Sequence, residues 1–136
     1  METKEHKKLK KLIEKYKTKL GLENYFIDTF ISENTHIIST HKNETVIKKS
    51  DYLAEVMNRD IRLEEFSLAI NRDAIKSDIE DTICHEMLHI LLWKMTDIIE
   101  NIISIANLDQ DGKAKLFCRF SELEHDVIEK LIKVVK

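Results

Sequence analysis

The chain has 136 residues, of which 43% are hydrophobic and 35% are charged, and its formal net charge is −3. This length favours one domain, residues 1–136, and this composition excludes a disordered chain. The sequence contains no proline and two glycines, so strong chain breakers are rare, which favours helices over a many-stranded β fold.

The N-terminal segment, residues 3–20, is predicted to form an amphipathic helix that ends at Gly21. Residues 1–20 hold eight lysines against three glutamates, a net charge of +5, so the rest of the chain carries −8. We interpret the lysines as a solvated helix face, with contact to nucleic acid as a weaker alternative.

Residues 22–71 consist of short runs of β-branched and aromatic residues between polar turns. The predicted strands cover residues 25–31, 36–40, 52–57 and 66–70. Turns are expected near Asn34, at Asn43-Glu44 and at 58–60. These runs predict a small, mostly antiparallel sheet of three or four strands, and therefore an α+β fold.

Two long helices are predicted to complete the chain. The first covers residues 77–106, where Ser77 and Glu80 match a capping box and a bend is expected near Thr96. A loop over 107–112 then leads to a final helix over 113–135.

The strongest motif is His85-Glu86-Met87-Leu88-His89, inside the first of these helices. Histidines four residues apart project from one face of a helix, so both can bind a single Zn²⁺ ion. Glu86 lies further round the helix, where its carboxylate can act as general base toward a water activated by the metal. The pattern is typical of zinc metallopeptidases.

This motif and its surroundings resemble the zincin superfamily of metallopeptidases. The resemblance implies a minimal zincin-like domain, in which an edge strand before the motif helix pairs with extended substrate. That role would fall to Ser67–Asn71, with Leu68, Ala69, Ile70 and Asn71 as substrate-binding residues. The general plan is similar to that of the compact ImmA/IrrE group.

The third metal ligand has to come from elsewhere in the chain. Leu92 and Met95 occupy positions where metzincins carry glycine and histidine, and Met95 likewise excludes the pattern of the bacterial ribosomal-RNA-processing ribonucleases. SprT-like proteins need a histidine soon after the motif, but the next one is His125. The remaining resemblance is to gluzincins, in which a second helix supplies a glutamate.

In the last helix, a turn of 100° per residue puts Glu124 near the centre of the apolar stripe, with His125 on its edge. A carboxylate on a core-facing stripe is costly to bury unless it is paired or binds a metal. Glu124 is therefore the predicted third ligand, and His125 is the alternative ligand or a group that orients Glu124.

These inferences predict a zinc-dependent peptidase with one Zn²⁺ per chain, Glu86 as general base, and a peptide or protein as substrate. The alternative is a zinc-binding regulatory or interaction module with weak or no catalysis, associated with nucleic acid through the basic helix. No apolar run is long enough to cross a membrane, and Cys84 and Cys118 fit no disulfide framework. We therefore expect a soluble cytoplasmic protein with no membrane partner.

Overall fold

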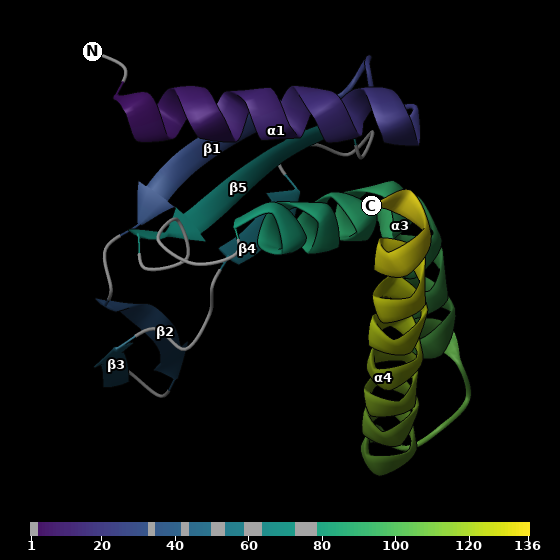
Figure 1. Ribbon diagram of the computed structural model, residues 1–136. Coiled ribbons are helices and arrows are strands. Elements are labelled where there is room, and N and C mark those ends of the chain that lie inside the picture. The colour runs from purple at the N-terminus through teal and green to yellow at the C-terminus, as the bar shows by residue number, and fades with distance from the viewer. Residues whose placement is uncertain (1–2, 33–34, 42–43, 50–53, 59–63, 73–78) are drawn as a thin grey trace.

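The computed structural model describes residues 3–32, 35–41, 44–49, 54–58, 64–72 and 79–136. In this part of the chain the elements are α1 (Lys4–Leu20), β1 (Phe26–Ser32), β2 (Thr35–His41), β3 (Glu44–Lys49), β4 (Ala54–Asn58), β5 (Glu65–Asn71), α3 (Ile79–Ile105) and α4 (Gln110–Val135). The predicted α+β fold is confirmed. The capping role predicted for Ser77 lies outside the described residues. Figure 1 shows α1 across one end of the molecule, above β1 and β5, and the α3–α4 hairpin extending away from it.

Helix α1 forms as its sequence predicts. The Thr3 side chain accepts a hydrogen bond from the His6 backbone N–H at the start, and Gly21 closes the helix with a φ of 72°. Leu9, Ile13 and Tyr16 are buried. The lysines lie between and opposite these positions, so the apolar face of α1 packs on the core while most of the lysines face solvent.

The sheet has three strands in the order β1-β5-β4, and β2 and β3 form a separate antiparallel hairpin. Strand β5 pairs in parallel with β1 and antiparallel with β4. Strand β3 was not predicted, because Asn43-Glu44 was assigned to a turn while the structure begins a strand at Glu44.

The prediction that residues 67–71 form an edge strand is wrong. Strand β5 is the central strand, and β1 and β4 occupy its two edges. The side chains of Leu68 and Ile70 are fully buried, and Asn71 is buried as well. Backbone groups paired on both sides cannot also pair with a peptide, so Leu68, Ala69, Ile70 and Asn71 form part of the core sheet and do not bind substrate by strand addition.

The core lies where α1, β5 and the first half of α3 meet, and Ile128 of α4 joins it. Ile83, Met87 and Leu88 contribute from α3, and each is fully buried. The same junction is tied by polar contacts, because Lys15 Nζ and Tyr16 Oη both donate hydrogen bonds to Glu80 Oε1, at 2.5 and 2.8 Å. The start of α3 is thereby fixed against α1.

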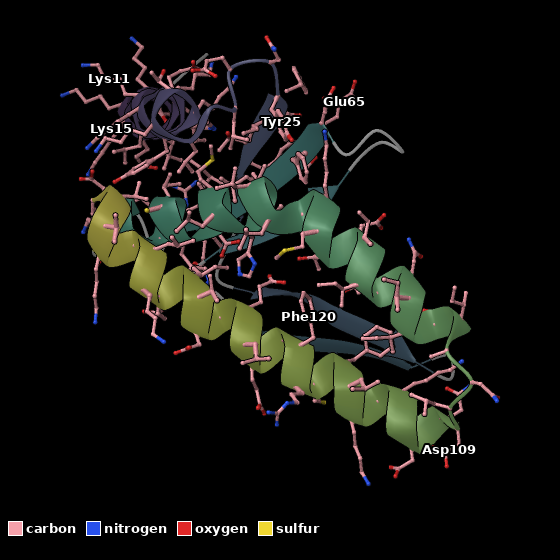
Figure 2. All side chains as sticks on the ribbon, turned by 90° about the vertical axis from the view of Figure 1, so that its right-hand side faces the viewer. Lys11, Lys15, Tyr25, Glu65, Asp109 and Phe120 are labelled. Atoms are coloured by element: carbon pink, nitrogen blue, oxygen red, sulfur yellow. The ribbon has the colours of Figure 1, made fainter. Side chains whose placement is uncertain are left out.

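Helices α3 and α4 form a long hairpin, and α4 returns along α3 toward α1 (Figures 1 and 2). The turn between them is closed by Asp109, whose Oδ1 accepts a hydrogen bond from Gly112 N–H at 2.7 Å. Because Asp109 caps α4, the helix begins at Gln110, three residues before the predicted start at 113. None of the described helices combines the length and apolar character that a membrane span requires.

Candidate metal centre

Three histidines from two helices converge on one point. His85 and His89 lie one turn apart on α3, and their Nε2 atoms are 3.1 Å apart. His125 reaches them from α4, and one nitrogen from each ring lies within 4.8 Å of the other two. Two imidazole nitrogens on a tetrahedral Zn²⁺ are about 3.3 Å apart, given Zn–N bonds of about 2.0–2.1 Å. The histidine pair on α3 therefore has the spacing that a shared ion requires.

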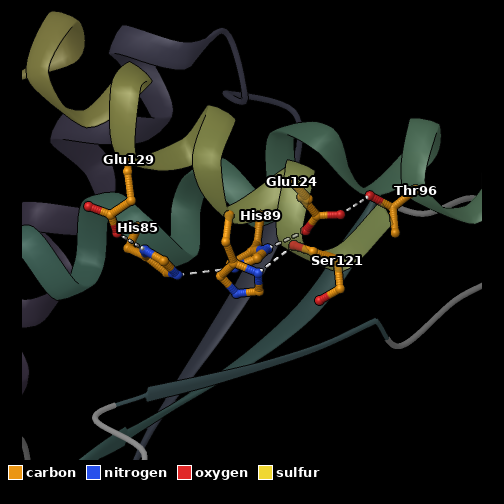
Figure 3. Close-up of polar contacts among 7 residues, drawn as sticks. His85, His89, Thr96, Ser121, Glu124 and Glu129 are labelled. Carbon is orange, nitrogen blue, oxygen red and sulfur yellow. Dashed lines mark hydrogen bonds and ion pairs between the residues drawn. The ribbon is translucent and has the colours of Figure 1, made fainter. Parts of the chain in front are cut away.

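The rings of His89 and His125 are each oriented by a short hydrogen bond at Nδ1. His89 Nδ1 lies 2.6 Å from Glu124 Oε1, and His125 Nδ1 lies 2.8 Å from the Ser121 backbone oxygen (Figure 3). An ionised carboxylate and a carbonyl can only accept, so each Nδ1 carries the proton and donates it. Each Nε2 then keeps a free lone pair, as a metal ligand requires.

His85 follows the same arrangement with a looser contact. Its Nδ1 lies 3.7 Å from Glu129 Oε1, on the next turn of α4. Burial lowers the pKa of His85, and the neighbouring His89 and His125 rings lower it further. The neutral ring is therefore favoured, which is the form that binds a metal.

Glu124, the predicted third ligand, lies beside the group of three histidines but is not a member of it. Glu124 is turned toward Nδ1 of His89, and its second oxygen accepts a hydrogen bond from Thr96 Oγ1 at 2.8 Å. The hydrogen bond from His89 lowers the pKa of Glu124, and the bond from Thr96 adds to this against the effect of burial. Its side chain is mostly buried, in agreement with its place on the apolar stripe, and its two oxygens accept hydrogen bonds from His89 and Thr96.

His125, the alternative ligand in the sequence analysis, is the third member of the histidine group that could hold an ion. The choice of Glu124 from the sequence assumes that the centre of the apolar stripe on α4 faces the metal. In the structure that centre packs toward α3, and the edge of the stripe that carries His125 turns toward the His85–His89 pair. Glu124 accepts the hydrogen bond of His89 Nδ1, and carboxylates commonly make this contact with histidines that bind zinc.

Glu86, the predicted general base, is half-buried on α3, next to His85 in the sequence. Strand β4 packs against α3, and it is one of the two outer strands of the described three-stranded sheet. The strand edge beside the motif helix is thus provided by β4, and not by β5 as the sequence analysis expected.

Sequence reasoning missed three further groups at this site: Thr96, Ser121 and Glu129. A hydroxyl at Thr96, seven residues after His89 on a helix, carries no signal of its own. Glu129 was detectable, since it is one turn beyond His125 and exposed carboxylates near histidines commonly orient them.

Comparison of the chain with protein-family models, with curated proteins and with solved structures finds no match. The resemblance to zincins therefore depends on the motif residues themselves.

Proposed function

We propose that this protein is a zinc-dependent peptidase whose metal is held by His85, His89 and His125. One observation carries the proposal. The Nε2 atoms of His85 and His89 lie 3.1 Å apart, while the Nδ1 atoms of His89 and His125 donate hydrogen bonds to acceptors. Three histidine ligands with a fourth position left for water or substrate are typical of catalytic zinc, whereas structural zinc is usually enclosed by four protein ligands.

The residues around the site have separate tasks in this proposal. Zinc bound there would supply Lewis acidity toward the scissile carbonyl and lower the pKa of water. Glu86 accepts the proton of the attacking water and later delivers it to the leaving amine. Glu124 holds His89 in the orientation and tautomer that leave Nε2 available.

We place the peptide along the outer edge of β4, which takes over the role first assigned to 67–71. Among the described residues no strand pairs with the outer edge of β4, and an extended peptide can join such an edge. Strand β4 also packs beside α3. Met57 on this strand is exposed and offers an apolar contact.

Activity and metal content together test this proposal. Glu86→Gln should retain zinc and lose at least about 100-fold in peptidase activity, because the base is removed and the ligands are kept. Glu100→Gln is the matched control, since Glu100 is an exposed glutamate on the same helix. Unchanged activity in Glu86→Gln would remove Glu86 from the mechanism.

The second candidate is a zinc-binding module that associates with nucleic acid. It is favoured by one observation, that Lys4, Lys7, Lys8 and Lys11 are all exposed on α1. Their spacing places them on one face of the helix. Salt-dependent binding of DNA or RNA that is lost on Lys7→Glu/Lys11→Glu would support this function, and no binding at low salt would reject it.

The two cysteines support an intracellular location as part of the same proposal. Both are free thiols, with Cys84 buried and Cys118 exposed. An exposed free thiol is compatible with a reducing compartment such as the cytoplasm.

A further inference from the structure

The outer part of the α3–α4 hairpin carries large apolar side chains that are exposed and that no described part of the chain covers. We call residues 91–127 the arm, and the exposed apolar residues on its two helices the arm face. The arm face consists of Leu91, Met95, Ile98, Ile102 and Ile105 on α3 and Leu116, Leu123 and Val127 on α4. Their exposed fractions range from 37% at Leu91 to 85% at Ile105.

The spacing of these residues is that of a helix seam. On α3 they recur at intervals of four, three, four and three residues, and on α4 the half-buried Phe120 completes a similar series. This alternation is the heptad pattern by which helices pack against one another. Scattered exposed apolar residues are normal on any protein, but a continuous heptad series on two helices is not.

The two series lie on the same side of the hairpin. The register of the helices is fixed by the Thr96–Glu124 hydrogen bond and by Lys113 Nζ, which donates to the Ser104 backbone oxygen at 2.7 Å. On each helix, the exposed residues come one position before the residues that face the other helix. One position corresponds to about 100° of rotation about the helix axis. Because the helices are antiparallel and this rotation is the same on both, the exposed residues of α3 and α4 lie on the same side of the hairpin. Met95 and Leu123 then lie side by side.

The arm face points away from the metal centre. His85 and His89 lie more than about 100° round α3 from the series that contains Leu91 and Met95. Covering the arm face would therefore leave the histidines and Glu86 accessible.

The amount of apolar surface suits a partner protein. The eight side chains together expose roughly 800 Å², which matches the area that one subunit contributes to a standard stable interface. The charges on the arm argue against a polyanionic partner, because between residues 91 and 127 seven acidic residues outnumber four basic ones. A nucleic acid or an anionic membrane surface would need the opposite balance.

The border of the arm face is complementary to itself. Arg119 and Asp126 are exposed on α4 seven residues apart, so they occupy equivalent places beside the series, and Asp126 also pairs with the exposed Lys130 of its own helix at 2.9 Å. A two-fold axis across the middle of the exposed series on α4 would set Arg119 of each copy opposite Asp126 of the other copy. It would also place the two bodies at opposite ends of the assembly.

We propose that two copies of this chain pair through their arm faces, forming an antiparallel four-helix bundle with the metal centres on its outside. Each α3 packs on the α3 of the second copy and each α4 on its α4, so the exposed isoleucines and leucines become a shared core. This proposal concerns the outer part of the hairpin and does not depend on zinc or catalysis.

Sedimentation equilibrium of the full chain tests this pairing. The wild type should have the mass of a dimer at micromolar concentration, and Ile98→Glu should weaken the dimer at least about 100-fold, because it buries a charge in the new core. Ser104→Glu is the matched control, an exposed position on the same helix outside the arm face, and it should remain dimeric. Circular dichroism and zinc content should be the same in all three proteins.

A charge exchange separates self-pairing from other uses of this face. Arg119→Asp should weaken the dimer about 5-fold or more, and Arg119→Asp/Asp126→Arg should restore it, since the exchange recreates both ion pairs. A monomeric wild type at about 100 µM would overturn the proposal. So would a dimer that Ile98→Glu leaves intact, or a monomer that binds phosphatidylserine vesicles through Ile98.

Discussion

The inner and outer halves of the α3–α4 hairpin share a helical pattern but differ in what surrounds them. In the inner half, Ile83, Met87 and Leu88 of α3 are fully buried by α1, the sheet and the start of the hairpin. In the outer half the same helix continues past the body, and Ile98 and Ile102 are more than half exposed. The comparison shows that an apolar stripe becomes core only where another element of the chain reaches it.

The candidate metal centre lies where the inner half of the hairpin meets the arm, and this junction is held from two sides. Glu80 at the start of α3 is bonded to α1, and Glu124 bonds α4 to both His89 and Thr96. Catalytic and metal-binding groups need such fixed orientations, which long exposed helices do not provide by themselves. The outer half is free to serve association.

The largest expected difference between the halves is in stability. Leu88→Ala should lower the free energy of unfolding by about 2–5 kcal/mol, because it leaves a cavity among buried side chains. Ile98→Ala should cost less than about 1 kcal/mol at concentrations where the chain is monomeric, since its side chain is already largely hydrated. Urea unfolding of both variants at low protein concentration checks this, and equal losses would contradict the comparison.

A smaller effect is expected from the hydrogen bond that orients His89. Glu124→Gln should lower zinc affinity about 10–100-fold without abolishing binding, which is the usual effect of removing such a partner. Competition with a fluorescent chelator measures the change. Glu122→Gln, an exposed neighbour on α4, is the control and should bind zinc as the wild type does. Complete loss of binding in Glu124→Gln would restore Glu124 as a ligand.

The smallest effect concerns pH and the contact between α1 and α3. Hydrogen bonds from Lys15 and Tyr16 hold the pKa of Glu80 below its usual value. The stability from this contact is therefore fully present above the ordinary glutamate pKa and is lost as pH falls through the lower folded-state pKa. Because the pair is partly exposed, it should contribute less than about 1 kcal/mol.

Unfolding measured between pH 3 and 7 should show a shallower acid loss in Glu80→Gln than in the wild type. Glu23→Gln, an exposed residue outside this contact, should leave the slope unchanged. An identical slope in Glu80→Gln would mean that the contact has no influence on acid stability.

Much of the fold could be predicted because its signals are local. The spacing of Leu9, Ile13 and Tyr16 predicts α1, and Gly21 marks its end. The apolar periodicity of α3 and α4 similarly predicts both helices to within a few residues. The order of the strands in the sheet is harder to predict, because it depends on which strands meet in space. No local pattern in the sequence indicates that β5 lies between β1 and β4.

The candidate site was predictable in part for the same reason. His85 and His89 share one helix, so their convergence follows from helix geometry alone. The choice between Glu124 and His125 depends on the rotation of α4 against α3, which packing of Ile128 and its neighbours decides. The helical spacing of α4 predicts that Glu124 faces the core. It cannot show that the carboxylate of Glu124 is hydrogen-bonded by His89.

X-ray absorption at the zinc edge tests the central claim most directly, because it reports the ligands of the bound ion in the intact protein. We expect three imidazole nitrogens at about 2.0 Å and one further light ligand, with one imidazole lost in His125→Ala. Glu124→Gln should leave the spectrum of the loaded protein unchanged. Two imidazoles and a carboxylate in the wild type, altered by Glu124→Gln and not by His125→Ala, would contradict the three-histidine centre.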